Sequence, residues 1–190
     1  MSAHQARDLI ERLAAADYDE TDAIQAELAA LGPDALGEML AQLPVLDPPR
    51  QFIVINVLRG KRDERILAAL SPFIESDNSA IAQVAIRAIA AQGTEAAYQA
   101  LHAALPGARD AVALHLINAL AASGVHAAIP DLIALVKRSE SDSVRYTAID
   151  ALGKLGASEA VPVITQCLDD ESKHVRARAE RALSRLTTSE

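Results

Sequence analysis

The sequence contains no tryptophan, and aromatic residues make up only 3% of its 190 residues. Glycine and proline, which are common in turns, occur eight times each. β-Sandwiches and β-barrels need aromatic and β-branched strands joined by many turns, so this composition excludes them. Alanine and leucine, which lead the helix-propensity scale, instead supply 40 and 23 residues. With a hydrophobic fraction of 51%, the sequence predicts a folded, all-α protein.

Cysteine and long apolar runs are also scarce. The single cysteine, Cys167, cannot form an internal disulfide, which favours a reducing, cytoplasmic environment. The longest strongly apolar stretch, residues 52–58, is much shorter than the roughly 20 residues of a membrane-spanning helix. Residues 1–12 lack the apolar core of a signal peptide. We therefore expect a cytoplasmic protein without a membrane partner.

The chain has no surplus of basic residues. Its 18 Lys and Arg residues are outnumbered by 26 Asp and Glu residues, for a net charge of −8. The whole excess lies in residues 1–49, which hold two basic and ten acidic residues, whereas residues 50–190 are balanced. Such a surface repels phosphate backbones, so we expect no nucleic-acid partner. The simplest interpretation of the excess is solubility, and a basic partner surface is the alternative.

The main positive signal is an internal repeat. Aligned on the glycines that close them, several segments share apolar or alanine residues at four and at eight positions before the glycine. A spacing of four residues indicates one face of a helix, and a closing glycine suits the left-handed position after a helix. The copies are residues 21–32, 81–93, 112–124, 144–156 and 175–187, the last with Thr187 in place of glycine.

A second predicted helix precedes each copy. Pro130 and Pro162 lie 32 residues apart near the starts of two such helices, where proline is tolerated. In the turns, Asn78, Asp110 and Asp142 are expected to cap the helices that follow. One helix pair cannot bury its apolar face alone, so the pairs must stack. The sequence therefore predicts an α-α superhelix of about six helix pairs in a single domain, 1–190, with repeats near 4–32, 34–60, 62–93, 95–124, 127–156 and 158–187.

Residues 128–156 and 160–186 carry a more specific pattern. Each reads Ala-Ile-Pro or Ala-Val-Pro, an apolar helix, a turn acid (Asp142 or Asp170), then Val-Arg and a helix of small residues. This pattern resembles the HEAT repeat, and more closely the short HEAT-like repeat of phycobilisome lyases. The resemblance implies a HEAT/armadillo-like solenoid in which Arg145 and Arg176 can form an Asp–Arg ladder between repeats. Ala82 and Ala113 occupy the arginine position in earlier copies.

The same resemblance implies that the second helix of each pair lines a concave groove. Positions ten, nine, six and two before each glycine fall on that face and belong neither to the predicted core nor to a cap. Tyr146 is the expected anchor, because tyrosine is enriched in binding hot spots. The candidate partner-binding residues are Arg87, His115, Asn118, Tyr146, Asp150, Arg178 and Arg181.

Motifs of catalytic or cofactor sites are missing. No histidine has another histidine or a cysteine three or four residues away, so we expect no metal site. The sequence has no phosphate-binding glycine loop and no GxSxG motif. Cys167 lies on the apolar side of its predicted helix and is interpreted as a buried hydrophobic residue. We therefore predict no catalytic residue and no cofactor.

These observations support two functions. The first is a non-catalytic HEAT-like adaptor or scaffold that binds a protein or peptide partner in its concave groove. The alternative, implied by the resemblance, is a subunit of a bilin lyase or a related chromophore-handling or chaperone-like protein. Such a protein would bind a bilin, and His115, Tyr146 and Asp150 are the candidate pigment contacts. The acidic residues 1–49 and the basic residues 173–185 predict a monomer or weak head-to-tail self-association.

Overall fold

The computed structural model describes residues 2–187 and divides the chain into two compact units, with the boundary between Gln92 and Gly93. The described residues form twelve α-helices and no β-strand. Consecutive helices form six antiparallel pairs, so the predicted all-α chain of about six helix pairs is confirmed. That residues 1–190 form a single domain remains a prediction.

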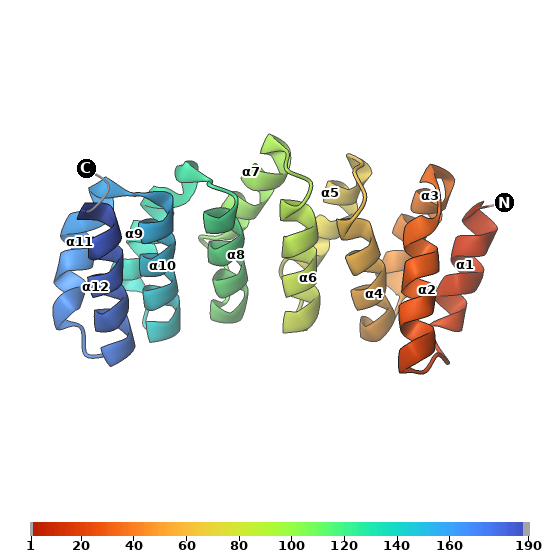
Figure 1. Cartoon of the computed structure of the whole chain (residues 1–190), viewed down its shortest axis with the longest axis horizontal. Helices are drawn as coiled ribbons and strands as arrows, with labels where there is room; N and C mark the ends of the chain where they lie inside the picture. Colours follow the sequence, from red (N-terminus) through yellow and green to blue (C-terminus); the bar gives the residue numbers. More distant parts are fainter. Residues whose placement is uncertain (1, 188–190) are drawn as a thin grey trace. The chain divides into compact units, whose positions relative to one another are not determined.

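Unit 1 contains the first six helices in two layers (Figure 1). Helices α2, α4 and α6 pack in a row, α1 packs against α2 and α3, and α5 packs against α6. Short 3-10 turns, Leu43–Val45 and Ser71–Phe73, follow α3 and α5. The helices are α1 (Ser2–Arg12), α2 (Tyr18–Ala30), α3 (Pro33–Gln42), α4 (Pro48–Arg59), α5 (Arg65–Leu70) and α6 (Ser79–Ala90).

Unit 2 repeats this arrangement with the last six helices (Figure 1). Helices α8, α10 and α12 form one row, with α10 packed against both neighbours. Helices α7, α9 and α11 form the other layer and pack against α8, α10 and α12, respectively. The helices are α7 (Glu95–Ala104), α8 (Asp110–Ala122), α9 (Ile129–Arg138), α10 (Asp142–Leu155), α11 (Val161–Gln166) and α12 (Lys173–Thr187).

Alanine lets the helices approach closely. The repeat position eight before the glycine holds Ala85, Ala148 and Ala179, each fully buried. Ala82 and Ala113, which occupy the arginine position of the ladder, are buried as well. Within residues 2–187 no buried side chain is polar or charged, so apolar burial holds the layers together.

Two of the three predicted helix caps are wrong by one residue. Asn78 caps α6 as expected, since its side chain accepts hydrogen bonds from the amides of Ala80 and Ile81. Helix α10 is instead capped by Ser141, and α8 begins after Arg109, which makes no side-chain cap. Asp110 and Asp142 lie in the first turns of these helices, where a carboxylate interacts favourably with the helix dipole.

The closing glycines do not all adopt the same conformation. Gly93, Gly124 and Gly156 have φ values of 68°, 69° and 67°, in the left-handed region that favours glycine. Gly32 has φ −70°, so the left-handed turn predicted there is wrong, and Gly60, which ends the repeat near 34–60, has φ −80° and is not left-handed either. Gly32 instead immediately precedes α3 as its N-cap. The repeat is therefore more regular after Gly93 than before it.

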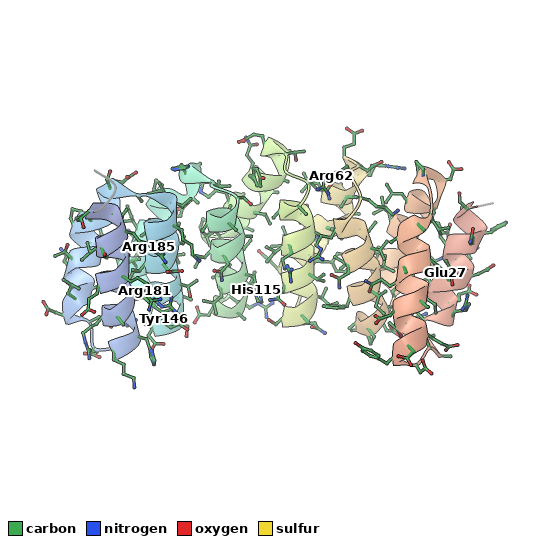
Figure 2. All side chains as sticks on the ribbon, in the orientation of Figure 1. Glu27, Arg62, His115, Tyr146, Arg181 and Arg185 are labelled. Atoms are coloured by element: carbon green, nitrogen blue, oxygen red, sulfur yellow. The ribbon has the colours of Figure 1, made fainter. Side chains whose placement is uncertain are left out.

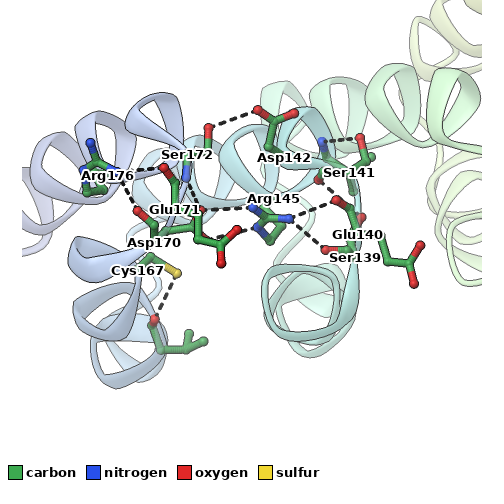
Figure 3. A network of polar contacts seen from close by, with 12 residues as sticks. Ser139, Glu140, Ser141, Asp142, Arg145, Cys167, Asp170, Glu171, Ser172 and Arg176 are labelled. Carbon is green, nitrogen blue, oxygen red and sulfur yellow. Dashed lines mark hydrogen bonds and ion pairs between the residues drawn. The ribbon is translucent and has the colours of Figure 1, made fainter.

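The Asp–Arg ladder forms between the last two repeats (Figure 3). The Arg145 guanidinium donates from Nε and Nη2 to the Asp170 carboxylate, at 3.2 and 3.0 Å. Its Nη1 donates to the carbonyls of Ser139 and Glu140, both at 3.1 Å. Arg176 makes the equivalent local contacts, donating to the carbonyls of Asp170 and Glu171 at 2.7 and 2.9 Å.

The ladder explains why Asp170 stays ionised. Burial opposes its charge, but the hydrogen bond from Arg145 and the amide of Ser172 outweigh burial and lower the pKa of Asp170 below its usual value. The Ser172 hydroxyl also donates to Asp142 at 3.0 Å, which adds a second link between the two turns. The residues that carry the family resemblance therefore join repeats and have a structural role.

Candidate functional site

The predicted site residues fall on four helices. His115 and Asn118 lie on α8, Tyr146 and Asp150 on α10, and Arg178 and Arg181 on α12, all in unit 2. The seventh predicted residue, Arg87, is exposed on α6 in unit 1.

Helices α10 and α12 approach each other closely because both carry small residues at the crossing. A Cβ atom added to Gly153 would lie 3.1 Å from the Cβ atom of Ala182. This close approach places the neighbouring turns of the two helices within reach of each other. Charged side chains on those turns can therefore form contacts between the helices.

Asp150 is the centre of these contacts. Its carboxylate lies 2.8 Å from the Nζ atom of Lys154, one turn later on α10. From α12, the guanidinium groups of Arg185 and Arg178 approach to 3.3 and 3.7 Å. Three cations thus surround one carboxylate, whose side chain is 17% exposed.

The surrounding cations determine the charge of Asp150. Burial disfavours its ionised form, but the hydrogen bond from Lys154 and the charges of Lys154, Arg178 and Arg185 outweigh burial and lower its pKa. Asp150 is therefore ionised at neutral pH. A single carboxylate does not neutralise three cations, so the surface keeps a net positive charge.

Tyr146 lies one turn before Asp150 and extends this cluster. The guanidinium carbon of Arg178 is 5.8 Å from the centroid of the Tyr146 ring, within the range of a cation–π interaction. The ring of His174 lies 6.3 Å from Tyr146 between centroids, tilted by 58°. We call Tyr146, Asp150, Lys154, His174, Arg178 and Arg185 the α10–α12 cluster.

The remaining predicted residues in unit 2 lie outside this cluster. Arg181 is exposed on α12, and Figure 2 shows it on the same side of the helices as Tyr146 and Arg185. On α8, Asn118 is exposed and donates from Nδ2 to the Leu114 carbonyl at 2.8 Å. His115 is partly buried, and burial lowers its pKa, so the ring is neutral at pH 7.

The structure brings together three of the predicted residues, Tyr146, Asp150 and Arg178, and adds Lys154, Arg185 and His174, which were not predicted from the sequence. Lys154 could have been found from its position four residues after Asp150, a favourable helical pairing. Arg185 lies 35 residues after Asp150, close to one repeat, and so faces it from the next second helix. Only the tertiary structure places His174 beside Tyr146.

Other chemistry is limited in the part of the chain that the structure describes. No three His, Cys, Asp or Glu side chains there are placed to hold a metal ion. Cys167 is buried, and its thiol donates to the Val163 carbonyl at 3.3 Å. Burial and the nearby Asp170 raise the pKa of the Cys167 thiol against the opposing charge of Arg145. No helix among residues 2–187 has the length and hydrophobicity needed to cross a bilayer.

A family model described as HEAT repeats matches residues 103–184. No curated protein matches the sequence. Among solved structures, the complex of CpcE and CpcF of phycocyanin lyase from Nostoc sp. PCC7120 superposes with a TM-score of 0.63 at 22% identity, covering 80% of this chain. The present chain spans 65% of the length of that structure's chain.

Two further structures show how widely the fold is used. A designed armadillo repeat protein in complex with the peptide (KR)4 has a TM-score of 0.54 at 17% identity, covering 94% of this chain and 98% of the designed one. Human deoxyhypusine hydroxylase in complex with glycerol has a TM-score of 0.50 at 15% identity, covering 95% and 83%. At these identities the likeness concerns the fold alone. Residues 103–184 therefore match HEAT repeats, and the chain has a HEAT/armadillo-like fold, similar in structure to a chain of the phycocyanin lyase complex of CpcE and CpcF.

Proposed function

We propose that the chain is a non-catalytic adaptor or scaffold that binds a protein or peptide partner through the row of helices α8, α10 and α12. The observation that carries this proposal is the α10–α12 cluster, where three cations and an aromatic ring surround one carboxylate. Arg87 would belong to a second contact on α6. The chain is proposed to act in the cytoplasm, as a monomer or a weakly self-associating species.

The chemistry of the cluster favours an acidic partner segment. Arg178 and Arg185 can each bind a carboxylate with two parallel hydrogen bonds, and Arg181 adds a further exposed guanidinium. Tyr146 offers a rigid ring with a polar end, which is typical of residues that dominate binding energy. A partner carboxylate can compete with Asp150 for these guanidinium groups without leaving any of them buried and unpaired.

A purely structural role is the competing explanation. Exposed ion pairs contribute only about 0–1 kcal/mol to stability, so the cluster could join α10 to α12 without any partner. The two explanations differ in their response to a ligand, because a structural cluster has no affinity for an added acidic peptide.

The test uses a fluorescein-labelled peptide of glutamates around one leucine, measured by fluorescence anisotropy at low salt. Tyr146→Ala and Arg178→Ala should each weaken binding by roughly tenfold, as expected of hot-spot residues. Lys137→Ala is the matched control, because it removes an exposed positive charge from α9 in the other layer. Equal binding by all four proteins, or none by the wild type, would reject the proposed surface.

A second candidate function rests on the similarity to the complex of CpcE and CpcF of phycocyanin lyase. Under this proposal the chain is a subunit that handles a bilin, and His115, Tyr146 and Asp150 contact the pigment. Incubation with phycocyanobilin should then change the visible absorbance spectrum, and Tyr146→Ala should reduce that change. No spectral change and no transfer to an apoprotein, either alone or with a partner subunit, would remove this candidate.

A further inference from the structure

Unit 1 contains a groove that the proposed function does not use. The groove has a volume of about 560 Å³ and is lined by α2, α4 and the start of α6. Its floor and walls include Pro48, Pro49, Phe52 and Ile53 from the first turns of α4. Across from them, α2 contributes Asp22 and its neighbours. The groove is therefore apolar on one side and carries a carboxylate on the other.

One exposed aromatic side chain lines this groove, and a second lies on α2 one turn before a lining residue. Phe52 lines it and is 39% exposed, although phenylalanine is normally buried. Tyr18 is 81% exposed and lies one helical turn before Asp22, on the same side of α2. Among residues 2–187 these are the two exposed aromatic side chains. Exposed aromatic residues around a hollow are typical of a surface that a partner covers.

The charge around the groove is negative. The first turns of α2 carry Asp19, Glu20 and Asp22, the helix has no lysine or arginine, and Asp17 caps its start. Asp22 is exposed and makes no hydrogen bond or ion pair within the described residues. Across the groove, the one nearby cation on α4, Arg50, is already paired with Asp47 at 3.1 Å.

The helix ends at the groove do not reverse this charge. Helices α2, α4 and α6 all begin near it, and each helix start is equivalent to about half a positive charge. Asp17 and Asp47 cap two of these starts with full carboxylates, and Asn78 caps the third with its side-chain oxygen. The capping carboxylates offset the helix dipoles, so Asp22 and Asp19, which lies one turn before it, leave the groove negative.

We propose that this groove binds a basic peptide segment that carries one large apolar side chain. The apolar side chain lies against Phe52, Pro48 and Pro49, and the flanking lysines or arginines pair with Asp22 and its acidic neighbours on α2. This inference goes beyond the proposed function, since it assigns a second surface, in the other unit, to a partner segment of opposite charge. It stands whether or not the α10–α12 cluster binds a partner.

The test uses a short fluorescein-labelled peptide of lysines and arginines around one phenylalanine. We expect the full chain to bind it with an affinity that falls as salt is raised, because exposed charge pairs are screened. A matched peptide with glycine in place of the phenylalanine should bind at least about threefold more weakly, since it loses the apolar contact. A peptide of glutamates around one phenylalanine should not compete for this groove.

Variants of the protein locate the binding site. Asp22→Asn removes an exposed charge at the groove and should weaken peptide binding by about threefold. Glu27→Gln is the matched control, because it removes an equal charge from another side of the same helix and should leave peptide binding unchanged. Phe52→Ala should weaken binding by roughly tenfold, with circular dichroism confirming that the variant is folded. Arg178→Ala in unit 2 should have no effect, which separates this result from the proposed function.

Several outcomes would overturn the proposal. Equal binding by wild type, Asp22→Asn and Phe52→Ala would mean that the peptide is attracted only by the general negative charge of residues 1–49. Equal affinity for the glycine-containing peptide would show that the apolar side chain of the peptide does not contribute to binding. If sedimentation shows a dimer that Phe52→Ala abolishes, the occupant of the groove is a second copy of this chain and the peptide proposal is wrong.

Discussion

The Arg185 guanidinium on α12 lies 3.3 Å from the Asp150 carboxylate on α10, although 35 residues separate them in the chain. The contact joins equivalent faces of successive repeats. It depends on the close approach of Gly153 and Ala182, which brings the two helices together. The same approach lets Arg178 lie over Tyr146. One packing feature thus organises the whole α10–α12 cluster.

The close approach itself can be tested with Gly153→Ala. The added Cβ atom would lie 3.1 Å from the Ala182 Cβ and 3.2 Å from its Cα, so α10 and α12 would have to move apart. Overpacking of this kind costs about 1–3 kcal/mol, which exceeds the gain of about 1 kcal/mol in helix propensity. We expect a lower midpoint of urea unfolding and weaker binding at the α10–α12 cluster.

Gly37→Ala provides the matched control, because Gly37 is also inside a helix but its Cβ would meet only the flexible end of Arg65 at 4.0 Å. This variant should be stabilised by about 0.5–1 kcal/mol through helix propensity alone. If both glycine variants are stabilised to the same extent, the contact between Gly153 and Ala182 does not limit the packing.

The Asp–Arg ladder should contribute measurably to stability. Arg145→Ala removes two hydrogen bonds to Asp170 and two to backbone carbonyls, and it leaves the Asp170 carboxylate, 16% exposed, without its cation. We expect a loss of about 1–3 kcal/mol in the free energy of unfolding, measured by urea denaturation. Arg138→Ala, at an exposed position on α9, should change stability by no more than about 0.5 kcal/mol. Similar losses in the two variants would contradict a specific role for the ladder.

Stability should fall in acid. The pKa values of Asp150 and Asp170 are lowered in the folded protein, so these groups stabilise it above the ordinary aspartate pKa of 3.8. That contribution is lost as pH falls from 3.8 through the lowered values, because the unfolded chain then binds protons more readily than the folded one. Urea unfolding between neutral pH and about pH 3 measures the loss. Asp150→Asn should flatten this dependence, and an unchanged pH profile would contradict the assignment.

Replacing a closing glycine by alanine should destabilise the protein only where the glycine has a positive φ. Gly156→Ala should destabilise the protein by about 1 kcal/mol, because Gly156 has φ 67° and alanine rarely adopts that conformation. Gly60→Ala should be nearly neutral, since Gly60 has φ −80° and its added Cβ would make an ordinary contact at 3.5 Å. Thermal unfolding followed by circular dichroism measures both changes. A destabilised Gly60→Ala would contradict the conformation described for that turn.

Much of the fold could be predicted because it depends on local patterns. The four-residue spacing of apolar positions and the prolines at helix starts are properties of short segments, and they correctly predict helices α9 and α11, which carry Pro130 and Pro162 in their first turns. The ladder between Arg145 and Asp170 was also predictable, since the family pattern contains both residues. The caps at Asp110 and Asp142 were misplaced because several adjacent polar residues can cap a helix.

The candidate site was only partly predictable. The helical spacing placed Tyr146 and Asp150 on one face of α10, and the repeat placed Arg178 on the equivalent face of α12. The sequence did not indicate which cations would reach Asp150, because those contacts depend on the distance between helices α10 and α12. Gly153 and Ala182 set that distance. The groove beside Phe52 was missed, since its wall is assembled from three helices that the sequence separates widely.

By itself, the sequence determined the fold class, the length of the repeat and the separation of acidic residues 1–49 from a balanced remainder. These properties follow from composition and periodicity, which act through local backbone preference and the burial of one helix face. The tertiary structure alone decided that Asp150 meets Arg178 and Arg185, and that Phe52 remains exposed beside Asp22. Such contacts depend on how closely helices pack and on where their ends lie, and interactions within one helix do not specify either.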